Sequence, residues 1–134
     1  MLANKSALVV ADDAHSLLAI CSILRDLGIC YKRNTTGVKV VEQVRAMTPP
    51  PDFILLDIDL ASGDAFGIYQ RLQSDPVTCT IPVIAIGSMP DYARSQRIRR
   101  ADFSAFVLKP LPRQRFADLV ERALSGEHVW EATT

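Results

Sequence analysis

The sequence predicts an α/β protein built on one parallel sheet with helices on both faces. Five short apolar runs alternate along the chain with five amphipathic stretches. The third run is apolar at nearly every position, which is typical of a strand buried on both sides. Such alternation indicates a doubly wound, five-stranded parallel sheet, because helices supply the crossovers between parallel strands. The length of 134 residues fits one domain, residues 1–134, with a core over about 5–124 and a loose C-terminal tail over 125–134.

The first half of the chain contains two strands and two helices. Residues 7–11 have the composition of a buried strand. A helix is predicted over residues 14–27, ended by Gly28, with one apolar face formed by Leu17, Leu18, Cys21, Leu24 and Leu27. Two elements then precede the prolines at 49–51, namely a weaker strand over 29–33 and a helix over 36–47 with Val40, Val41 and Val44 inward.

The second half contains three strands and three helices. The third strand, residues 52–57, is the nearly all-apolar run. Pro82 suits only the beginning of the fourth strand, which we place at 81–86. Pro112 is tolerated in the first turn of the last helix, because the amide hydrogens there have no partner within the helix. The remaining elements are helices over 65–73, 90–100 and 112–124, and a strand over 105–108.

The composition limits the classes of partner. Lys and Arg (15) balance Asp and Glu (15), so the chain has no overall attraction to nucleic acid or anionic membranes. No apolar stretch is long enough for membrane insertion. The three cysteines lack the spacing of a disulfide framework or zinc site, which favours reduced thiols and a cytoplasmic location.

One predicted helix is basic and forms either a solvated surface or a partner surface. Its arginines are Arg94, Arg97, Arg99 and Arg100. No aromatic or recognition-helix pattern accompanies these arginines, so we expect no direct contact with nucleic acid.

Charged side chains follow the predicted strands where each strand ends. Asp12 and Asp13 follow the first strand, Asp57 ends the third, and Lys109 follows the fifth. In open α/β sheets, ligands bind beyond the carboxyl ends of the strands, where the strand order reverses. We therefore expect three carboxylates and one ammonium group to converge at one edge of the sheet.

Such a cluster suits phosphoryl chemistry. Carboxylates that lie close together repel one another unless a cation lies among them, and hard oxygen ligands suit Mg²⁺, or Mn²⁺. A carboxylate in that setting can attack phosphorus and form an aspartyl phosphate, while Lys109 pairs with the phosphoryl oxygens. Taken singly, an Asp at a strand end is more often a helix cap, and Asp13 and Asp64 could cap the first and third helices. The coincidence of several strand ends favours the phosphoryl site.

The chain resembles the receiver domain of response regulators in two-component signalling over about residues 5–124. Asp12 and Asp13 match the metal-binding pair of that family, and Asp57 matches its phosphoacceptor. Ser74-Asp75-Pro76 leading into 81–84 is similar to the approach to the fourth strand. The run from Phe106 to Pro110 resembles the fifth-strand signature, whose Lys–Pro peptide is typically cis.

The resemblance implies a flavodoxin-like (βα)5 sheet with strand order 2-1-3-4-5. It implies that Asp57 takes a phosphoryl group from a histidine kinase or phosphotransfer protein. The metal would be held by Asp12, Asp13, Asp57 and the main-chain carbonyl of Asp59. A downstream protein would bind the face formed by the fourth helix, fifth strand and fifth helix.

Three positions depart from the family pattern. Gly87 stands where the family has Thr or Ser at the end of the fourth strand, and Ser88 comes one residue later. Phe106 stands where many members have Tyr, and the segment from Ile58 to Ala65 lacks the usual Met-Pro and Asp-Gly pairs. We therefore expect the conformational switch at Gly87, Ser88 and Phe106 to be weak or altered.

Two alternatives remain open. One is a pseudo-receiver, an interaction module that works without phosphorylation, which Gly87 favours. The other is a phosphatase, because Asp57-Ile58-Asp59 is similar to the nucleophile motif of haloacid-dehalogenase-type enzymes. That motif normally lies on the first strand of a larger chain and leaves Asp12 and Asp13 unexplained, so we do not expect a turnover enzyme.

Overall fold

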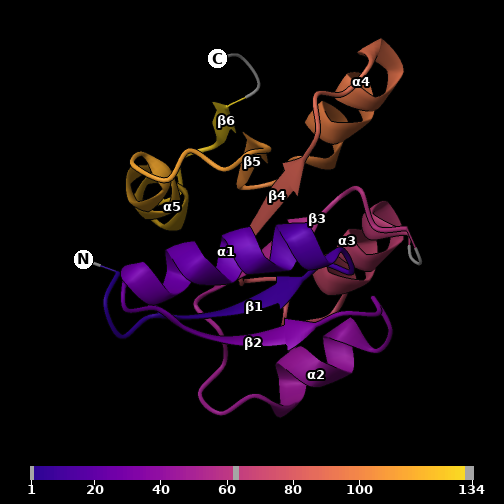
Figure 1. The fold of residues 1–134 in the computed structure, drawn as a ribbon. Coiled ribbons are helices and arrows are strands. Elements are labelled where there is room, and N and C mark those ends of the chain that lie inside the picture. The colour runs from indigo at the N-terminus through magenta and orange to yellow at the C-terminus, as the bar shows by residue number, and fades with distance from the viewer. Residues whose placement is uncertain (1, 62–63, 132–134) are drawn as a thin grey trace.

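The computed structural model describes residues 2–61 and 64–131, which form one parallel sheet between two layers of helices (Figure 1). The strand order is β2-β1-β3-β4-β5-β6, so the expected order 2-1-3-4-5 is confirmed and a sixth strand extends it. The elements are β1 (Ser6–Val10), α1 (Ala14–Asp26), β2 (Cys30–Asn34), α2 (Val40–Ala46), β3 (Phe53–Asp57), α3 (Ala65–Ser74), β4 (Val83–Gly87), α4 (Tyr92–Ala101), β5 (Ala105–Leu108), α5 (Phe116–Leu124) and β6 (Val129–Glu131).

Successive side chains of each central strand enter two separate apolar cores. Ala7 and Val9 of β1 face the core beneath α1 and α5, whereas Leu8 and Val10 face the core beneath α2, α3 and α4. All five residues of β3 and all five of β4 are buried, as expected for strands covered on both faces. By contrast, β2 lies at an edge and is mostly exposed, which explains its weak sequence pattern.

Helix α2 begins later than predicted because the Asn34 side chain forms hydrogen bonds with the backbone of the preceding loop. The side-chain Oδ1 of Asn34 accepts from the amide of Gly37 at 2.8 Å, and its side-chain Nδ2 donates to the carbonyl of Val38 at 2.9 Å. These bonds hold residues 35–38 outside the helix, and Lys39 then adopts a left-handed conformation with φ 57°. The helix therefore begins at Val40 instead of residue 36.

Helix α5 also begins later than predicted, so the placement of Pro112 in its first turn was wrong. The amide of Arg115 donates to the carbonyl of Pro112 at 3.0 Å, which closes a separate turn. The helix begins only at Phe116, whose side chain is completely buried against β5 and α1 residues of one core.

The expectation of a loose tail was wrong for residues 129–131, which form β6 alongside β5. Ala105, Phe106 and Val107 of β5 pair in parallel with Val129, Trp130 and Glu131. Residues 132–134 lie outside the described part of the chain. None of the helices within the described ranges is long and apolar enough to cross a membrane.

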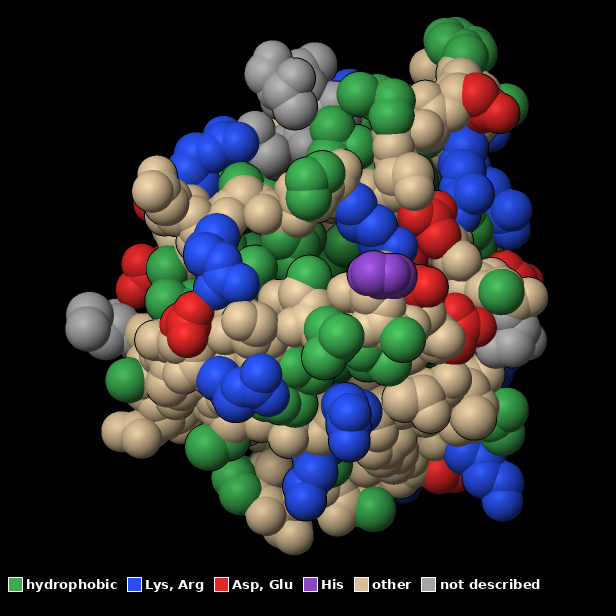
Figure 2. All heavy atoms as spheres, viewed as in Figure 1, with side chains coloured by type: hydrophobic (Ala, Val, Ile, Leu, Met, Phe, Trp, Pro, Cys, Tyr) green, Lys and Arg blue, Asp and Glu red, His purple; other side chains and the backbone are tan. Residues whose placement is uncertain are grey.

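The surface shows no field of one sign on the face drawn in Figure 2. Acidic side chains gather toward the right of that face, beside basic side chains (Figure 2). On the basic helix α4, several arginines contact the chain itself. The guanidinium of Arg97 lies 4.1 Å above the Phe66 ring, and that of Arg99 lies 4.0 Å above the Trp130 ring. These arginines are therefore partly used in packing rather than extended into solvent.

Candidate functional site

The site is centred on Asp57, the last residue of β3. As the last residue of its strand, Asp57 lies at the carboxyl edge of the sheet. Because β3 lies next to β1, this is also the point where the strand order reverses. Only 2% of Asp57 is exposed. Its Oδ1 accepts from the amide of Asp59 at 2.8 Å, and its Oδ2 accepts from Nζ of Lys109 at 2.8 Å. The carboxylate is therefore held by two donors, as a buried charge requires.

Lys109 follows β5 and reaches across β4 to the acidic group. Its ammonium lies 2.8 Å from Asp57 and 3.4 Å from Oδ2 of Asp59, with the side chain 24% exposed. Burial alone would lower the pKa of Lys109, but the hydrogen bond and charge of Asp57, with the charge of Asp59, outweigh it and raise the pKa. The Lys109–Pro110 peptide is cis, as the resemblance implied. The ammonium is thus held in its charged form beside the carboxylate.

The Asp59 carboxylate links three loops at this edge. Its Oδ2 accepts from the amide and from Oγ of Ser88, at 2.8 and 2.7 Å, and its Oδ1 lies 3.3 Å from Nη2 of Arg94. Burial favours the neutral acid, but the Ser88 hydrogen bonds and the charges of Lys109 and Arg94 together lower the pKa of Asp59. The Ser88 hydroxyl therefore points to the same edge as Asp57, although its neighbour Gly87 ends the strand.

Arg94 is a site contact that the sequence analysis did not identify. Asp91 caps α4 by accepting from the amide of Arg94 at 2.8 Å, which places Arg94 in the first turn of the helix. From there its guanidinium donates to the carbonyl of Ile58, next to Asp57. A capping Asp three residues before an Arg, in the short connection between a strand and a helix, is the signal that could have indicated this contact.

The acidic pair after β1 divides between two tasks. Asp13 caps α1 by accepting from the amide of Ser16 at 2.9 Å, and this bond is the main reason that its pKa is lowered. Asp12 accepts from the amide of Ala61 at 3.4 Å, across the β3–α3 loop. The capping role considered for Asp13 is thus present, whereas Asp64 precedes α3 without a side-chain cap.

The oxygen donors near Asp57 suit a hard divalent cation in chemistry and position, although the described side chains are not yet arranged in ligand geometry. Asp12 follows β1 and Asp57 ends the neighbouring β3, and the last pair of residues between these two strands is Val10 with Leu56. Only Oδ2 of Asp13 is used in the helix cap. Within residues 2–61 and 64–131, no group of three or more His, Cys, Asp or Glu side chains is already gathered in ligand geometry. The oxygen donors are therefore at the right edge but not drawn together.

Gly87 is required by close packing beneath the site. A Cβ placed on this residue would lie 2.6 Å from Cγ1 of Ile58 and 3.4 Å from Cε1 of Phe106. Real Cβ contacts are not that short, so Ile58 occupies the space that a Thr or Ser side chain would need. Phe106 is itself buried, at 1% exposure. The side chain of Ile58, on the neighbouring loop, thus takes the space that a hydroxyl-bearing side chain at position 87 would need.

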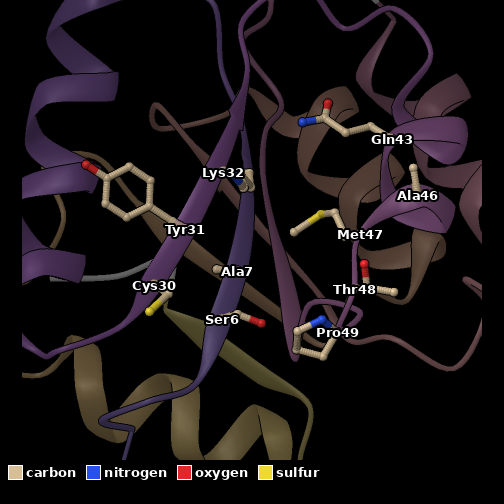
Figure 3. A pocket seen from close by; sticks show the side chains of 10 residues that line it. All are labelled: Ser6, Ala7, Cys30, Tyr31, Lys32, Gln43, Ala46, Met47, Thr48 and Pro49. Carbon is tan, nitrogen blue, oxygen red and sulfur yellow. The ribbon is translucent and has the colours of Figure 1, made fainter.

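A separate cavity of about 510 Å³ lies away from this site, at the amino ends of β1 and β2 (Figure 3). Met47 points into it, whereas Tyr31 points toward α1, where its hydroxyl accepts from Arg25 (Figure 3). The lining contains no carboxylate and one lysine, Lys32. This lining offers no constellation for phosphoryl or metal chemistry, so the site at Asp57 remains the candidate.

Comparison with known proteins finds matches to one family. The sequence profile of the response regulator receiver domain matches residues 7–121. The chain is 26% identical over 121 residues to the polar-differentiation response regulator DivK of Brucella ovis, covering 90% of this chain and 97% of that protein. The Brucella anthropi DivK is also 26% identical, over 120 residues, covering 90% of this chain and 96% of the relative.

Solved structures show the same fold. The receiver domain of a signal transduction histidine kinase from Syntrophus aciditrophicus is 25% identical, with a TM-score of 0.79 and coverage of 91% of both chains. The receiver domain of a sensor histidine kinase from Pseudomonas aeruginosa, described with a magnesium ion in its active-site cleft, has a TM-score of 0.81 at 20% identity, covering 92% of this chain and 99% of that one. The profile match over most of the length, carried on this fold, shows that the chain belongs to the response regulator receiver domain family.

Proposed function

We propose that residues 1–134 act as a single receiver domain in which Asp57 accepts a phosphoryl group from a histidine kinase or a phosphotransfer protein. An Asp57 carboxylate oxygen forms the new bond to phosphorus. The bond from phosphorus to the donor's imidazole nitrogen breaks, and its electron pair stays on that nitrogen. The observation that carries the proposal is the buried Asp57 carboxylate, held by Lys109 and the Asp59 amide at the switch point of the sheet.

The residues of this chain contribute positioning and charge. The Asp59 amide fixes one carboxylate oxygen, so the other is oriented toward the edge where Lys109 lies. The Lys109 ammonium can follow the new phosphoryl oxygens, and Ser88, whose hydroxyl already faces this edge, can donate to them. In this way Ser88 would take the place of the hydroxyl that Gly87 lacks.

Asp12, Asp13, Asp57 and the main-chain carbonyl of Asp59 would hold Mg²⁺, or Mn²⁺. When bound, the cation supplies positive charge that offsets the phosphoryl and carboxylate oxygens. The magnesium ion described in the Pseudomonas aeruginosa receiver domain is consistent with this assignment. Asp13 can contribute through the oxygen that does not cap α1.

The signalling output is proposed to leave through the face formed by α4, β5 and α5. Phe106 on β5 lies beneath Gly87 and Ile58, and so connects the phosphoacceptor loop with that face. A downstream protein would recognise the arrangement that this face adopts after phosphorylation.

A pseudo-receiver that works without phosphate is the second candidate, and the packing of Ile58 over Gly87 favours it. Incubation with acetyl phosphate and Mg²⁺, read by intact mass, separates the two. We expect one added phosphoryl group in the wild type and none in Asp57→Asn. A wild type that gains no adduct, and whose melting temperature does not change with Mg²⁺, would instead support the pseudo-receiver.

A further inference from the structure

The C-terminal strand β6 covers the edge of β5 that would otherwise end the sheet. Its first residue, Val129, donates to the carbonyl of Ser104 at 3.0 Å, and three residues pair with β5. Val129 is buried in the core beneath α1 and α5, whereas Trp130 packs on the core beneath α4. In Figure 1, β6 lies beside β5, with α5 and α4 to its two sides. The segment thus occupies the middle of the face proposed for signalling.

Trp130 joins β5 and α4 through two ring contacts. Its ring centroid lies 5.0 Å from that of Phe106, and the guanidinium of Arg99 lies 4.0 Å above its ring. Just before the strand, His128 Nδ1 lies 3.2 Å from the Phe103 carbonyl. These contacts hold the segment on α4 as well as on the sheet.

The attachment of β6 is short and incompletely packed. Within the described part of the chain the strand has three residues, Val129–Glu131, and Trp130 is half-buried. A cavity of about 230 Å³ lies between α4 and β6, lined in part by Ile98, Phe103 and Trp130. A strand with so few packing contacts belongs to the least stable part of a fold.

Phe106 links this strand to the phosphoacceptor. On one side, Cε1 of its ring would lie 3.4 Å from a Cβ added to Gly87. The side chain of Ile58, the residue after Asp57, occupies the place of that Cβ. On the other side its ring contacts Trp130. Any movement of Phe106 in response to the site therefore disturbs the contact that holds β6.

We propose that β6 is a displaceable strand that covers the β5 edge in the resting protein and is released when Asp57 carries a phosphoryl group. This inference rests on the proposed function. The surface then uncovered fits an extended partner segment, which pairs in parallel with β5 and places an aromatic side chain on Phe106 and Arg99. The chain's own segment already occupies the surface in this manner, which shows what chemistry the surface accepts.

The first test uses Trp130, which is the single tryptophan of the sequence. Acrylamide quenching of its fluorescence is measured on the full chain, with and without Mg²⁺ and beryllofluoride as the phosphoryl mimic. We expect quenching to increase with the mimic in the wild type and to stay constant in Asp57→Asn. Amide hydrogen exchange of residues 129–131 should accelerate under the same conditions.

Arg99→Gln provides a matched pair with Arg100→Gln. Both variants remove one charge from α4, but only the first removes the stack on Trp130. Arg99→Gln should raise quenching in the resting state, and Arg100→Gln should leave it unchanged. Equal quenching in the two variants would show that the stack does not hold β6.

A fluorescently labelled peptide of residues 125–134 tests the uncovered surface. We expect it to bind the full chain more tightly with Mg²⁺ and beryllofluoride than without, and equal binding would overturn the proposed surface. If acetyl phosphate adds its phosphoryl group but quenching stays constant, the release of β6 is wrong and the proposed function stands. If neither the adduct nor the quenching change is seen, both fail.

Discussion

Replacement of Lys109 by Met tests whether the Asp57–Lys109 pair organises the site. The variant keeps most of the side-chain volume but removes the ammonium, which leaves a carboxylate that is 2% exposed without its charged partner. Removal of one partner from a fully buried pair costs about 3–5 kcal/mol. Lys109 is 24% exposed, and Asp57 keeps the Asp59 amide, so we expect a smaller loss of about 1.5–3 kcal/mol. Domains of this size are stable by about 5–15 kcal/mol, so the variant should remain folded.

The assay is urea unfolding followed by far-ultraviolet circular dichroism, with a double-mutant cycle as the control. Asp57→Asn removes the buried charge and keeps an acceptor for the Asp59 amide. In that background Lys109→Met should cost at least about 1 kcal/mol less than in the wild type. The same cost in both backgrounds would refute the pairing, because Lys109 would then stabilise the fold through some other contact.

Three further predictions concern packing, capping and pH. Gly87→Ala should lower the free energy of unfolding by about 1–3 kcal/mol, since its Cβ meets Ile58, and the loss should shrink in an Ile58→Ala background; a neutral Gly87→Ala would contradict the packing. Asp13→Ala should lower the melting temperature without Mg²⁺ through loss of the α1 cap, whereas Asp13→Asn should keep the cap; both should show a smaller rise in melting temperature with Mg²⁺. The lowered pKa of Asp59 contributes stability above its ordinary value of 3.8 that is lost as pH falls through the folded value. The raised pKa of Lys109 contributes stability below its ordinary value of 10.5 that is lost as pH rises through the folded value. Asp59→Asn should weaken the acid limb of the unfolding profile, and also reduce the alkaline limb, because the charge of Asp59 helps to raise the pKa of Lys109.

The sheet and the helices that cover it could be predicted because hydrophobic periodicity reports burial directly. The run from Phe53 to Leu56 is apolar because both of its faces are buried, and that pattern needs no knowledge of its neighbours. The strand β6 could not be predicted in this way, because Val129–Glu131 is too short for a period to be visible. Its structure depends on the free edge of β5, a contact across more than twenty residues of sequence.

The candidate site was predictable where the backbone alone places a residue. Parallel strands bring Asp12, Asp57 and Lys109 to one edge whatever their side chains do. The positions of Arg94 and Ser88 depend instead on how two loops turn, and the hydrogen bonds to Asp59 become visible only in three dimensions. The packing of Ile58 into the space beside Gly87 is likewise a tertiary contact, and the departure from the family pattern at position 87 does not by itself reveal it.

The most direct measurement locates the phosphoryl group by chemical trapping. After incubation with acetyl phosphate and Mg²⁺, borohydride reduces an aspartyl phosphate to homoserine, and tandem mass spectrometry of the digested chain identifies the residue. We expect homoserine at position 57 in the wild type and at no position in Asp57→Asn. Homoserine at Asp12, Asp13 or Asp59 in the wild type, or an Asp57 left intact after full treatment, would contradict the assignment of Asp57 as the phosphoacceptor.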